Sequence, residues 1–399
     1  MAVVDHGEGN VTRRGFQTEA IHGGAREAGE GMTPVTRGVE LATTWRWPDP
    51  DAADDLRGAV EPHRFYRRHG NPNVESLEAR VAALEGAPRA LCVGSGMAAN
   101  TLALMAVAPE GGAVACQPTV YGEVSTFLKG VGARFGLSLR AARGWDLAHL
   151  IEAMAGARAL FLELPANPTL DVVDLAAVAR EAMVRGVRVV VDATLATPFN
   201  LRPLEHGADV VTHSATKYLS GHSDAMGGVI AGDDATVTAA WHLARVMGPT
   251  LAPFDAWLIE RGLRTLGLRM ERVNANAERV AAFLAGHAKV ERVAYPTVEG
   301  HPSTPEARAP YRGFGGLMGV VPRGGVEGAK RFVRALELFA LATSLGGVES
   351  LVQFPASMAR LTAEERSALG IPEAMVRLAV GCEDVDDLIE DLARALERV

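Results

Sequence analysis

Short apolar runs alternate with amphipathic stretches along most of the chain. Val187–Val191 and Ala208–Thr212 are apolar almost without interruption, and Ala90–Val93, Ala113–Ala115 and Ala159–Leu164 have a similar character. Runs of this length and composition are typical of strands that are buried on both faces. The pattern therefore predicts an α/β fold with a mostly parallel sheet, built by right-handed strand–helix–strand crossovers and covered by helices.

The helical periodicity is clearest in two places. In Val74–Glu85, the residues Leu77, Val81 and Leu84 are spaced to form one apolar stripe. Gly248–Glu278 is also strongly helical, and the chain changes texture after it. The remainder predicts a smaller α/β layer, with strands at 290–295 and 317–321 and helices at 326–336 and 384–396.

The N-terminal region has a different composition from the rest. Met1–Arg14 is polar and contains glycine, so we expect no fixed structure there. Gly29–Pro62 is rich in Pro, Gly, Asp and Thr, which predicts an extended arm that needs another surface to lie on; a loose tail is the alternative. The predicted division is an arm over 1–62, a large domain over 63–250 and a C-terminal domain over 251–399.

Composition excludes several classes of protein. The chain has 399 residues, 48% of them hydrophobic and 22% charged, which describes a globular protein with more than one core. A net charge of −8 without a long Lys/Arg block gives no reason to expect nucleic acid. Three scattered cysteines predict reduced thiols in the cytoplasm, not disulfides or a metal site. No apolar run is long enough for a membrane span, and the N-terminus lacks a signal-peptide core.

Polar residues follow the two longest apolar runs at the point where each ends. Asp192 follows the first, and Ser214, Thr216 and Lys217 follow the second. Carboxyl ends of parallel strands face a common crevice. There, a lysine could form a Schiff base with pyridoxal phosphate, two hydroxyls could bind its phosphate, and a carboxylate could keep the pyridine nitrogen protonated. Alone, Lys217 is typical of a surface lysine and Asp192 of a helix cap; their joint placement favours the cofactor site.

A second phosphate-binding pattern lies nearer the N-terminus. The strand Ala90–Val93 runs into Gly94–Ala99 and then into a helical pattern, so a glycine turn precedes a helix N-terminus. The same residues fit a relaxed dinucleotide fingerprint, which requires an acidic residue about 20 positions on. Instead, the next strand runs into Cys116, Gln117 and Pro118, so the dinucleotide interpretation fails.

The motifs around the lysine resemble those of one enzyme family. Val191–Thr194 reads VDAT and His213–Asp224 reads HSATKYLSGHSD, similar to the Cys/Met-metabolism family of pyridoxal-phosphate enzymes. This family contains cystathionine γ-synthases and γ-lyases, methionine γ-lyases and homoserine sulfhydrylases. The resemblance extends from about Phe16 to the C-terminus, although Ala193 stands where the family usually has Asn.

The resemblance implies a fold and an assembly. The fold is the PLP-dependent transferase fold type I, with a mostly parallel seven-stranded sheet in the large domain, a smaller C-terminal α/β domain and an extended N-terminal arm. The arm crosses to a neighbouring subunit and helps to form its active site. The implied assembly is a homotetramer built from dimers that share active sites.

The resemblance also assigns cofactor contacts. Tyr66 and Arg68, within RFYRRHGNPN, match the segment that contacts the cofactor phosphate of the adjacent subunit; without the family, Arg68 would be interpreted as a solvated charge. The backbone amides of Gly96 and Met97 are implied to hold phosphate. Asn167, in ELPANP, is implied to contact the ring hydroxyl.

Three further residues are implied to act on the substrate. Tyr121 lies against the ring in the family and helps to move the leaving group's proton, although a tyrosine before a helix usually only packs. Ser344 in SLGGVES and Arg377 in VRLAVG match residues that fix the substrate α-carboxylate; Arg377 alone would be interpreted as a strand-edge charge. Lys217 then removes the Cα proton and the protonated ring delocalises the charge.

The implied reaction has two branches. Loss of a γ-substituent leaves a β,γ-unsaturated intermediate. That species either takes a new nucleophile at Cγ or collapses to ammonia and 2-oxobutanoate. The sequence does not distinguish γ-replacement from γ-elimination.

The family match breaks at residues that would contact the distal end of the substrate. Thr126 stands where cystathionine-handling relatives have an arginine, Glu123 where methionine γ-lyases have a cysteine, and Glu40 where the arm usually has a tyrosine; Thr343 replaces the Glu or Val before SLG. Two new carboxylates and a lost guanidinium predict a cationic or hydrogen-bond-donating distal group.

S-adenosylmethionine or a guanidino amino acid would meet that requirement. In the alternative, Glu40 and Glu123 face solvent or pair with Arg37 and Arg46, and the activity is that of a methionine or cystathionine γ-lyase or an O-acyl-homoserine sulfhydrylase. A binder without catalytic activity is a further alternative, which the intact Lys217, Asp192, Tyr121 and Arg377 disfavour.

Overall fold

The computed structural model describes residues 14–24, 34–51, 65–355, 362, 364, 366 and 369–399. Its larger sheet has seven strands in the order β1-β7-β6-β5-β4-β2-β3. The strands are β1 (Arg89–Val93), β2 (Gly112–Cys116), β3 (Leu137–Ala141), β4 (Ala159–Glu163), β5 (Arg188–Asp192), β6 (Val210–Ser214) and β7 (Gly228–Gly232). Only β7 runs antiparallel to its neighbours within this sheet, so the predicted mostly parallel sheet is confirmed.

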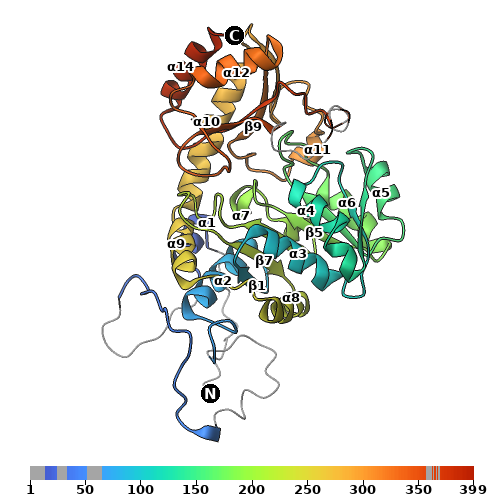
Figure 1. Cartoon of the computed structure of the whole chain (residues 1–399), viewed down its shortest axis with the longest axis vertical. Helices are drawn as coiled ribbons and strands as arrows, with labels where there is room; N and C mark the ends of the chain where they lie inside the picture. Colours follow the sequence, from blue (N-terminus) through green and yellow to red (C-terminus); the bar gives the residue numbers. More distant parts are fainter. Residues whose placement is uncertain are drawn as a thin grey trace.

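Helices cover both faces of this sheet (Figure 1). They are α2 (Pro72–Glu85), α3 (Gly96–Val107), α4 (Gly122–Lys129), α5 (Leu147–Met154), α6 (Leu175–Val184), α7 (Thr197–Asn200) and α8 (Asp234–Met247), with 3-10 turns at η2 (Gly132–Phe135) and η3 (Pro203–His206). Val190 belongs to the core under α3 and α8, whereas Val189 and Val191 belong to the core under α5 and α6. Because successive strand residues enter different cores, the run contains no polar position.

Three details differ from the sequence-based expectations. The strand expected at 208–212 is displaced to Val210–Ser214, because His213 and Ser214 pair with Val229 and Gly228 of β7. Neither β3 nor β7 was expected, since one is partly polar and the other is bounded by glycines. The helix expected over 248–278 is two helices, α9 (Pro253–Leu263) and α10 (Leu266–Ala285).

The C-terminal part forms a second sheet of five strands in the order β10-β11-β12-β9-β8. The strands are β8 (Val290–Ala294), β9 (Leu317–Pro322), β10 (Ala340–Leu341), β11 (Leu351–Gln353) and β12 (Val376–Ala379), and the helices of this part are α11 (Pro305–Arg308), α12 (Gly325–Ala335) and α14 (Val385–Leu396). The long helix α10 runs along one side of the molecule towards this sheet (Figure 1). A smaller α/β layer was expected here, and it is present.

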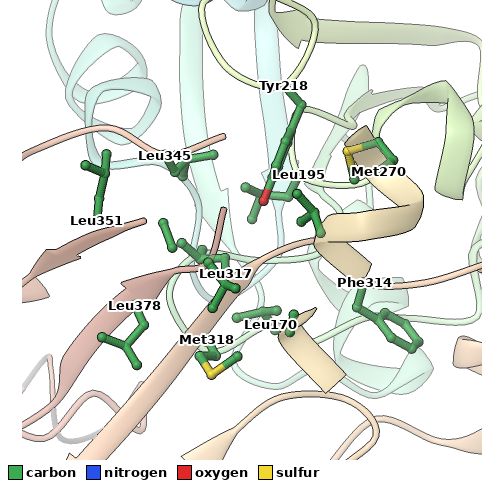
Figure 2. Close-up of a cluster of buried hydrophobic side chains, with 14 of the residues drawn as sticks. Leu170, Leu195, Tyr218, Met270, Phe314, Leu317, Met318, Leu345, Leu351 and Leu378 are labelled. Atoms are coloured by element: carbon green, nitrogen blue, oxygen red, sulfur yellow. The ribbon is translucent and has the colours of Figure 1, made fainter. Parts of the chain in front are cut away.

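A buried apolar cluster joins the small sheet to the loops that follow β5 and β6. Figure 2 shows Leu195 and Tyr218 from those loops packed with Leu317, Leu345 and Leu378. The Tyr218 hydroxyl also accepts a hydrogen bond from the amide of Gly316, at 2.8 Å. This cluster brings the chain around Ser344 and Arg377 to the carboxyl edge of the large sheet.

The N-terminal region is described only in part. Helix α1 (Phe16–His22) packs on the body, and residues 34–51 extend away from it below α2 and α9 (Figure 1). Residues 1–13, 25–33 and 52–64 lie outside the described residues. The predictions for Met1–Arg14 and for the extended arm concern these residues in part. Among the described helices, none is long and apolar enough to cross a bilayer.

Candidate active site

Lys217 lies just beyond β6, and its amine contacts Ser344, which lies between β10 and β11 of the small sheet. Lys217 Nζ donates to Ser344 Oγ at 2.7 Å. Burial lowers the pKa of Lys217 below its usual value, and the positive charge of Arg377 lowers it further. The neutral amine, which is the nucleophilic form, is therefore more accessible here than on a surface lysine.

Ser344 has an uncommon backbone conformation. Its φ is 86°, in the left-handed region that residues other than glycine rarely adopt. Its side chain accepts from Lys217 and its carbonyl accepts from Arg377 Nη2 at 2.8 Å. Nearby, a Cβ added to Gly346 would lie 2.7 Å from the Tyr218 backbone nitrogen, so this loop closes tightly on the lysine segment.

Arg377 lies on β12, and its guanidinium contacts Ser344 and Asn167. Its guanidinium donates to the Gln353 side-chain oxygen and, at 3.4 Å, to Asn167 Oδ1, while Nε is buried without a partner. Burial lowers the pKa of Arg377 to about 10. A buried guanidinium without a carboxylate partner in these contacts is suited to bind an anion.

Asp192 ends β5 and is held by donors from two elements. Its Oδ1 accepts from the Thr194 amide at 3.0 Å and from Thr194 Oγ1 at 2.5 Å. Its Oδ2 accepts from Asn100 Nδ2 of α3 at 2.8 Å. Sequence reasoning assigned no role to Asn100 or Thr194, because neither residue type stands out in a helix interior or after a strand.

Glu163 ends β4 and connects two predicted site residues. Its carboxyl oxygens accept from the amides of Tyr121 and Asn167, at 2.6 and 3.1 Å. Burial raises the pKa of Glu163 to about 8, and the neighbouring Asp192 raises it further. Glu163 belongs to the motif ELPANP, but nothing in the motif indicated that its carboxyl group accepts hydrogen bonds from the amides of Tyr121 and Asn167.

The N-terminus of α3 lies against the end of β6. A Cβ added to Gly96 would lie 2.7 Å from Ser214 Cβ, so only glycine allows this approach. Ser95 caps the helix by accepting from the Ala98 amide at 3.1 Å, and the first amides of a helix have no intrahelical acceptor. Gly96, Met97 and Ser214 thus form a cradle suited to an anion.

Tyr121 and Glu123, two further predicted residues, lie at the N-terminal end of α4. Tyr121 is 48% exposed at the start of α4. Partial burial raises its pKa, and the charges of Glu123 and Glu163 raise it further while Arg377 lowers it. Glu123 is exposed. Thr216, on the lysine segment, donates its hydroxyl to the carbonyl of Gly227 and accepts from the amide of the same residue.

Arg68 and Glu40 form hydrogen bonds near α8 and α2, outside the group around Lys217, whereas Thr343 is next to a member of that group. Arg68 donates to the carbonyl of Arg245 at the end of α8, at 2.7 Å, and its guanidinium lies over the ring of Tyr66. Glu40 is exposed; its amide donates to Asn73 Oδ1 and its carbonyl accepts from Asn71 Nδ2. Thr343 is exposed beside Ser344.

This donor set fits pyridoxal phosphate. Lys217 supplies a buried amine for the aldehyde, Asp192 retains acceptor capacity for a protonated ring nitrogen, and the α3 cradle supplies amides for a phosphate. The partnerless Nε of Arg377 suits an amino-acid carboxylate. Among the described residues, no group of His, Cys, Asp and Glu could hold a metal ion.

Comparison with known sequences gives a consistent set of similarities. The family model described as "Cys/Met metabolism PLP-dependent enzyme" matches residues 17–397. The L-methionine gamma-lyase of Pseudomonas putida is 42% identical over 391 residues, covering 96% of this chain and 97% of that protein. The cystathionine gamma-lyase of Dictyostelium discoideum is 37% identical, covering 96% and 97%. The O-succinylhomoserine sulfhydrylase of Pseudomonas aeruginosa is 38% identical, covering 96% and 95%.

Solved structures agree with this. A protein from Campylobacter jejuni described as an O-acetylhomoserine (thiol)-lyase superposes with a TM-score of 0.89 at 30% identity, covering 96% of this chain and 99% of that one, and it carries a pyridoxyl-lysine monophosphate residue. The metB protein of Corynebacterium glutamicum superposes with a TM-score of 0.88 at 34% identity, covering 96% and 98%.

Proposed function

Because the chain belongs to the Cys/Met-metabolism family of pyridoxal-phosphate-dependent enzymes, we propose that Lys217 is its cofactor lysine and that the site around it acts on the γ-substituent of an amino acid. The predicted family, fold class and cofactor are confirmed by the family match and the similar structures. The enzyme is a lyase or transferase that carries out γ-elimination or γ-replacement. The bound cofactor supplies an electron sink for charge that develops on the substrate carbon.

One contact carries the assignment of the lysine. The Lys217 amine lies 2.7 Å from Ser344 Oγ, and the carbonyl of the same serine accepts from Arg377. A substrate carboxylate bound by Arg377 and Ser344 would therefore have its Cα close to Lys217 Nζ. We assign to this amine the removal of the Cα proton, which its lowered pKa favours at neutral pH.

Other residues of the group receive supporting roles in the proposal. Asp192 would hold the ring nitrogen, and Asn167 would contact the ring hydroxyl. The Gly96 and Met97 amides, with the Ser214 and Thr216 hydroxyls, would bind the phosphate. Tyr121, whose amide Glu163 fixes at 2.6 Å, would move the proton of the leaving group.

The proposal includes a second copy of the chain. Tyr66 and Arg68 lie beside α8 and not beside Lys217, and Tyr66 is 40% exposed. These residues, together with the extended arm, would reach the phosphate and the wall of a neighbouring subunit's site. The assembly would be a homotetramer built from dimers that share active sites.

We propose a cytoplasmic location on the basis of the thiols. Cys92, Cys116 and Cys382 are free cysteines, and the first two are buried. Free thiols persist in reducing compartments, which is where an enzyme of amino-acid sulfur metabolism without disulfides would be expected to act.

The finer proposal concerns the substrate's distal group. Glu123 is exposed beside the site, and its negative charge raises the pKa of Tyr121, so its field reaches the catalytic group. Thr126, one turn later on α4, replaces the arginine of cystathionine-handling relatives. These features favour a substrate with a cationic or donor end, such as S-adenosylmethionine or a guanidino amino acid, with Glu40 supplied by the arm.

A second candidate is a conventional activity. The 42% identity with an L-methionine gamma-lyase over nearly the whole chain favours elimination from methionine or cystathionine, or a homoserine sulfhydrylase reaction. In that case Glu40 and Glu123 are solvated surface carboxylates.

A substrate panel separates the two candidates. Production of 2-oxobutanoate is measured with S-adenosylmethionine, methionine, cystathionine and O-acetylhomoserine, for the wild type, Glu123→Gln and Lys217→Ala. We expect Lys217→Ala to be inactive and Glu123→Gln to lose about fivefold in kcat/KM on the cationic substrate only. Glu110→Gln, an exposed carboxylate before β2, is the matched control. Brisk cystathionine cleavage without turnover of a cationic substrate would end the finer proposal.

A further inference from the structure

Asp192 belongs to a group of buried polar side chains. Asn100, Thr212 and Asp192 are 3%, 0% and 7% exposed. Asn100 is the fifth residue of α3, a helix whose sequence GMAANTLALMAV is otherwise largely apolar. An amide in such a position costs free energy unless both of its ends are hydrogen-bonded.

Both ends of the amide have partners. Asn100 Nδ2 donates to Asp192 Oδ2 at 2.8 Å. Asn100 Oδ1 accepts from Thr212 Oγ1 at 2.5 Å. The three residues come from α3, β5 and β6, so the group crosses from the helix to two adjacent strands.

The direction of these hydrogen bonds is determined by chemistry. An ionised carboxylate only accepts, so Asn100 must present its NH₂ group to Asp192. Its carbonyl oxygen then faces Thr212, whose hydroxyl must donate. The carboxylate of Asp192 therefore selects the orientation of the amide, and the Thr212 hydroxyl satisfies the amide oxygen in that orientation.

These contacts determine how many further hydrogen bonds the Asp192 carboxylate can accept. Oδ1 already accepts two hydrogen bonds from Thr194, and Oδ2 accepts one from Asn100. One acceptor direction on Oδ2 is left. On the neighbouring strand β4, Glu163 is paired with Asp192, so two carboxyl groups lie side by side. The hydrogen bonds that Asp192 accepts from Thr194 and Asn100 offset the repulsion between them.

We propose that Asn100, whose amide oxygen accepts a hydrogen bond from Thr212, is a positioning residue that aims Asp192 at the ring nitrogen of the cofactor. The inference rests on the proposed role of Asp192 and adds residues to which sequence reasoning gave no function. Asn100 touches neither cofactor nor substrate in this scheme. Its effect passes through one carboxylate oxygen, and it should therefore be visible only with a ligand that has a ring nitrogen.

The test compares pyridoxal phosphate with its deaza analogue, in which the ring nitrogen is replaced by C–H. Dissociation constants of both ligands for the apoenzyme are measured by equilibrium dialysis. The ratio of the two constants reports the interaction at the ring nitrogen. The proteins are the wild type, Asn100→Leu, Thr212→Val and Asp192→Asn.

We expect the wild type to prefer pyridoxal phosphate by about tenfold or more, because a hydrogen bond to a charged group is stronger than one between neutral groups. Asn100→Leu should reduce this preference to about threefold or less, and Thr212→Val should reduce it by a smaller factor in the same direction. Asn276→Leu is the matched control, because Asn276 is a buried asparagine of α10 that donates to the carbonyls of Gly381 and Glu383. It should leave the ratio unchanged.

Two outcomes are distinguishable failures. If Asn100→Leu weakens both ligands equally, Asn100 only packs and the inference is overturned, while the role of Asp192 stands. If the wild type itself does not discriminate, the role proposed for Asp192 fails and the inference fails with it. Should Asn100→Leu not fold, Thr212→Val decides, because a retained wild-type ratio in that variant shows that the support of the Asn100 amide does not reach Asp192 and overturns the inference.

Discussion

At the scale of single residues, the chemistry of Lys217 depends on two neighbours from the C-terminal part. Ser344 holds the amine at 2.7 Å, and Arg377 supplies a positive charge that opposes its protonation. Burial removes water from the Arg377 guanidinium. This desolvation costs free energy and lowers the pKa of Arg377 to about 10. A substrate carboxylate would relieve that cost, so the same arginine can activate the lysine before binding and hold the substrate afterwards.

The charge of Arg377 should be measurable at Lys217. In Arg377→Leu the pKa of Lys217 should rise towards its ordinary value, because the second cause of its lowering is removed while burial remains. The rate at which apoenzyme captures pyridoxal phosphate, followed in the visible band, should then reach its plateau at higher pH than in the wild type. Arg377→Lys keeps the charge and should retain the wild-type midpoint. Identical midpoints in all three proteins would contradict this electrostatic account.

At the scale of elements, the α3 N-terminus depends on one glycine. Gly96 lies against the end of β6 with no space for a side chain, as its added Cβ would lie 2.7 Å from Ser214 Cβ and 2.9 Å from Ser214 Cα. The helix can therefore present its first amides at the same edge where β6 delivers Ser214 and Lys217. A larger residue would move the helix N-terminus away from that edge.

Gly96→Ala tests this approach. Overpacking should destabilise the apoenzyme by about 1–3 kcal/mol and weaken its affinity for pyridoxal phosphate, measured by thermal unfolding and equilibrium dialysis. Gly122→Ala is the matched control, because Gly122 is also the first residue of a helix, α4, and its added Cβ meets nothing within 4 Å. The control should stay within about 0.5 kcal/mol of the wild type. Equal effects of both substitutions would indicate a general cost of replacing a helix-initiating glycine.

Element boundaries followed from local sequence only where the pattern was local. The run Val187–Val191 predicted β5 to within one residue, because its uninterrupted apolar character comes from burial on both faces. The end of β6 was misplaced by two residues, because His213 and Ser214 are strand residues through pairing with β7, which lies 14 or more positions later in the sequence. No property of His213 itself indicates that partner.

At the scale of the whole molecule, a common apolar cluster joins the two sheets and brings Lys217 and Ser344 into contact. Leu195 and Tyr218 follow the large sheet's strands, and Leu317, Leu345 and Leu378 belong to the C-terminal part (Figure 2). The arm is the opposite case. Trp257 Nε1 donates to the carbonyl of Arg37, and Asn73 forms hydrogen bonds with Gly38 and Glu40, so residues 37–40 are fixed to the body and residues 41–51 extend away from it (Figure 1).

The exposed apolar residues of the arm should stabilise the assembly. Leu41 and Trp47 are 63% and 42% exposed in the single subunit. The double variant Leu41→Ser/Trp47→Ser should raise the subunit dissociation constant by at least about tenfold, since each buried apolar side chain contributes roughly 1.5–3 kcal/mol. Sedimentation at several concentrations measures this. Met183→Ser/Val184→Ser, at the end of α6 with 74% and 79% exposure, is the control. An unchanged sedimentation profile of the arm variant would contradict the proposed role of the arm.

The sequence by itself determined the alternation of apolar strands and helices, the residues at the strand ends, and the motifs that resemble the family. These features are local: side-chain periodicity and adjacency in the chain decide them. Only the tertiary structure decided which distant groups act on one another. Lys217 and Ser344 are 127 positions apart, and Asn100 and Asp192 are 92 positions apart. Contacts of that separation result from the burial of two sheets against common helices and against each other, which a one-dimensional pattern does not specify.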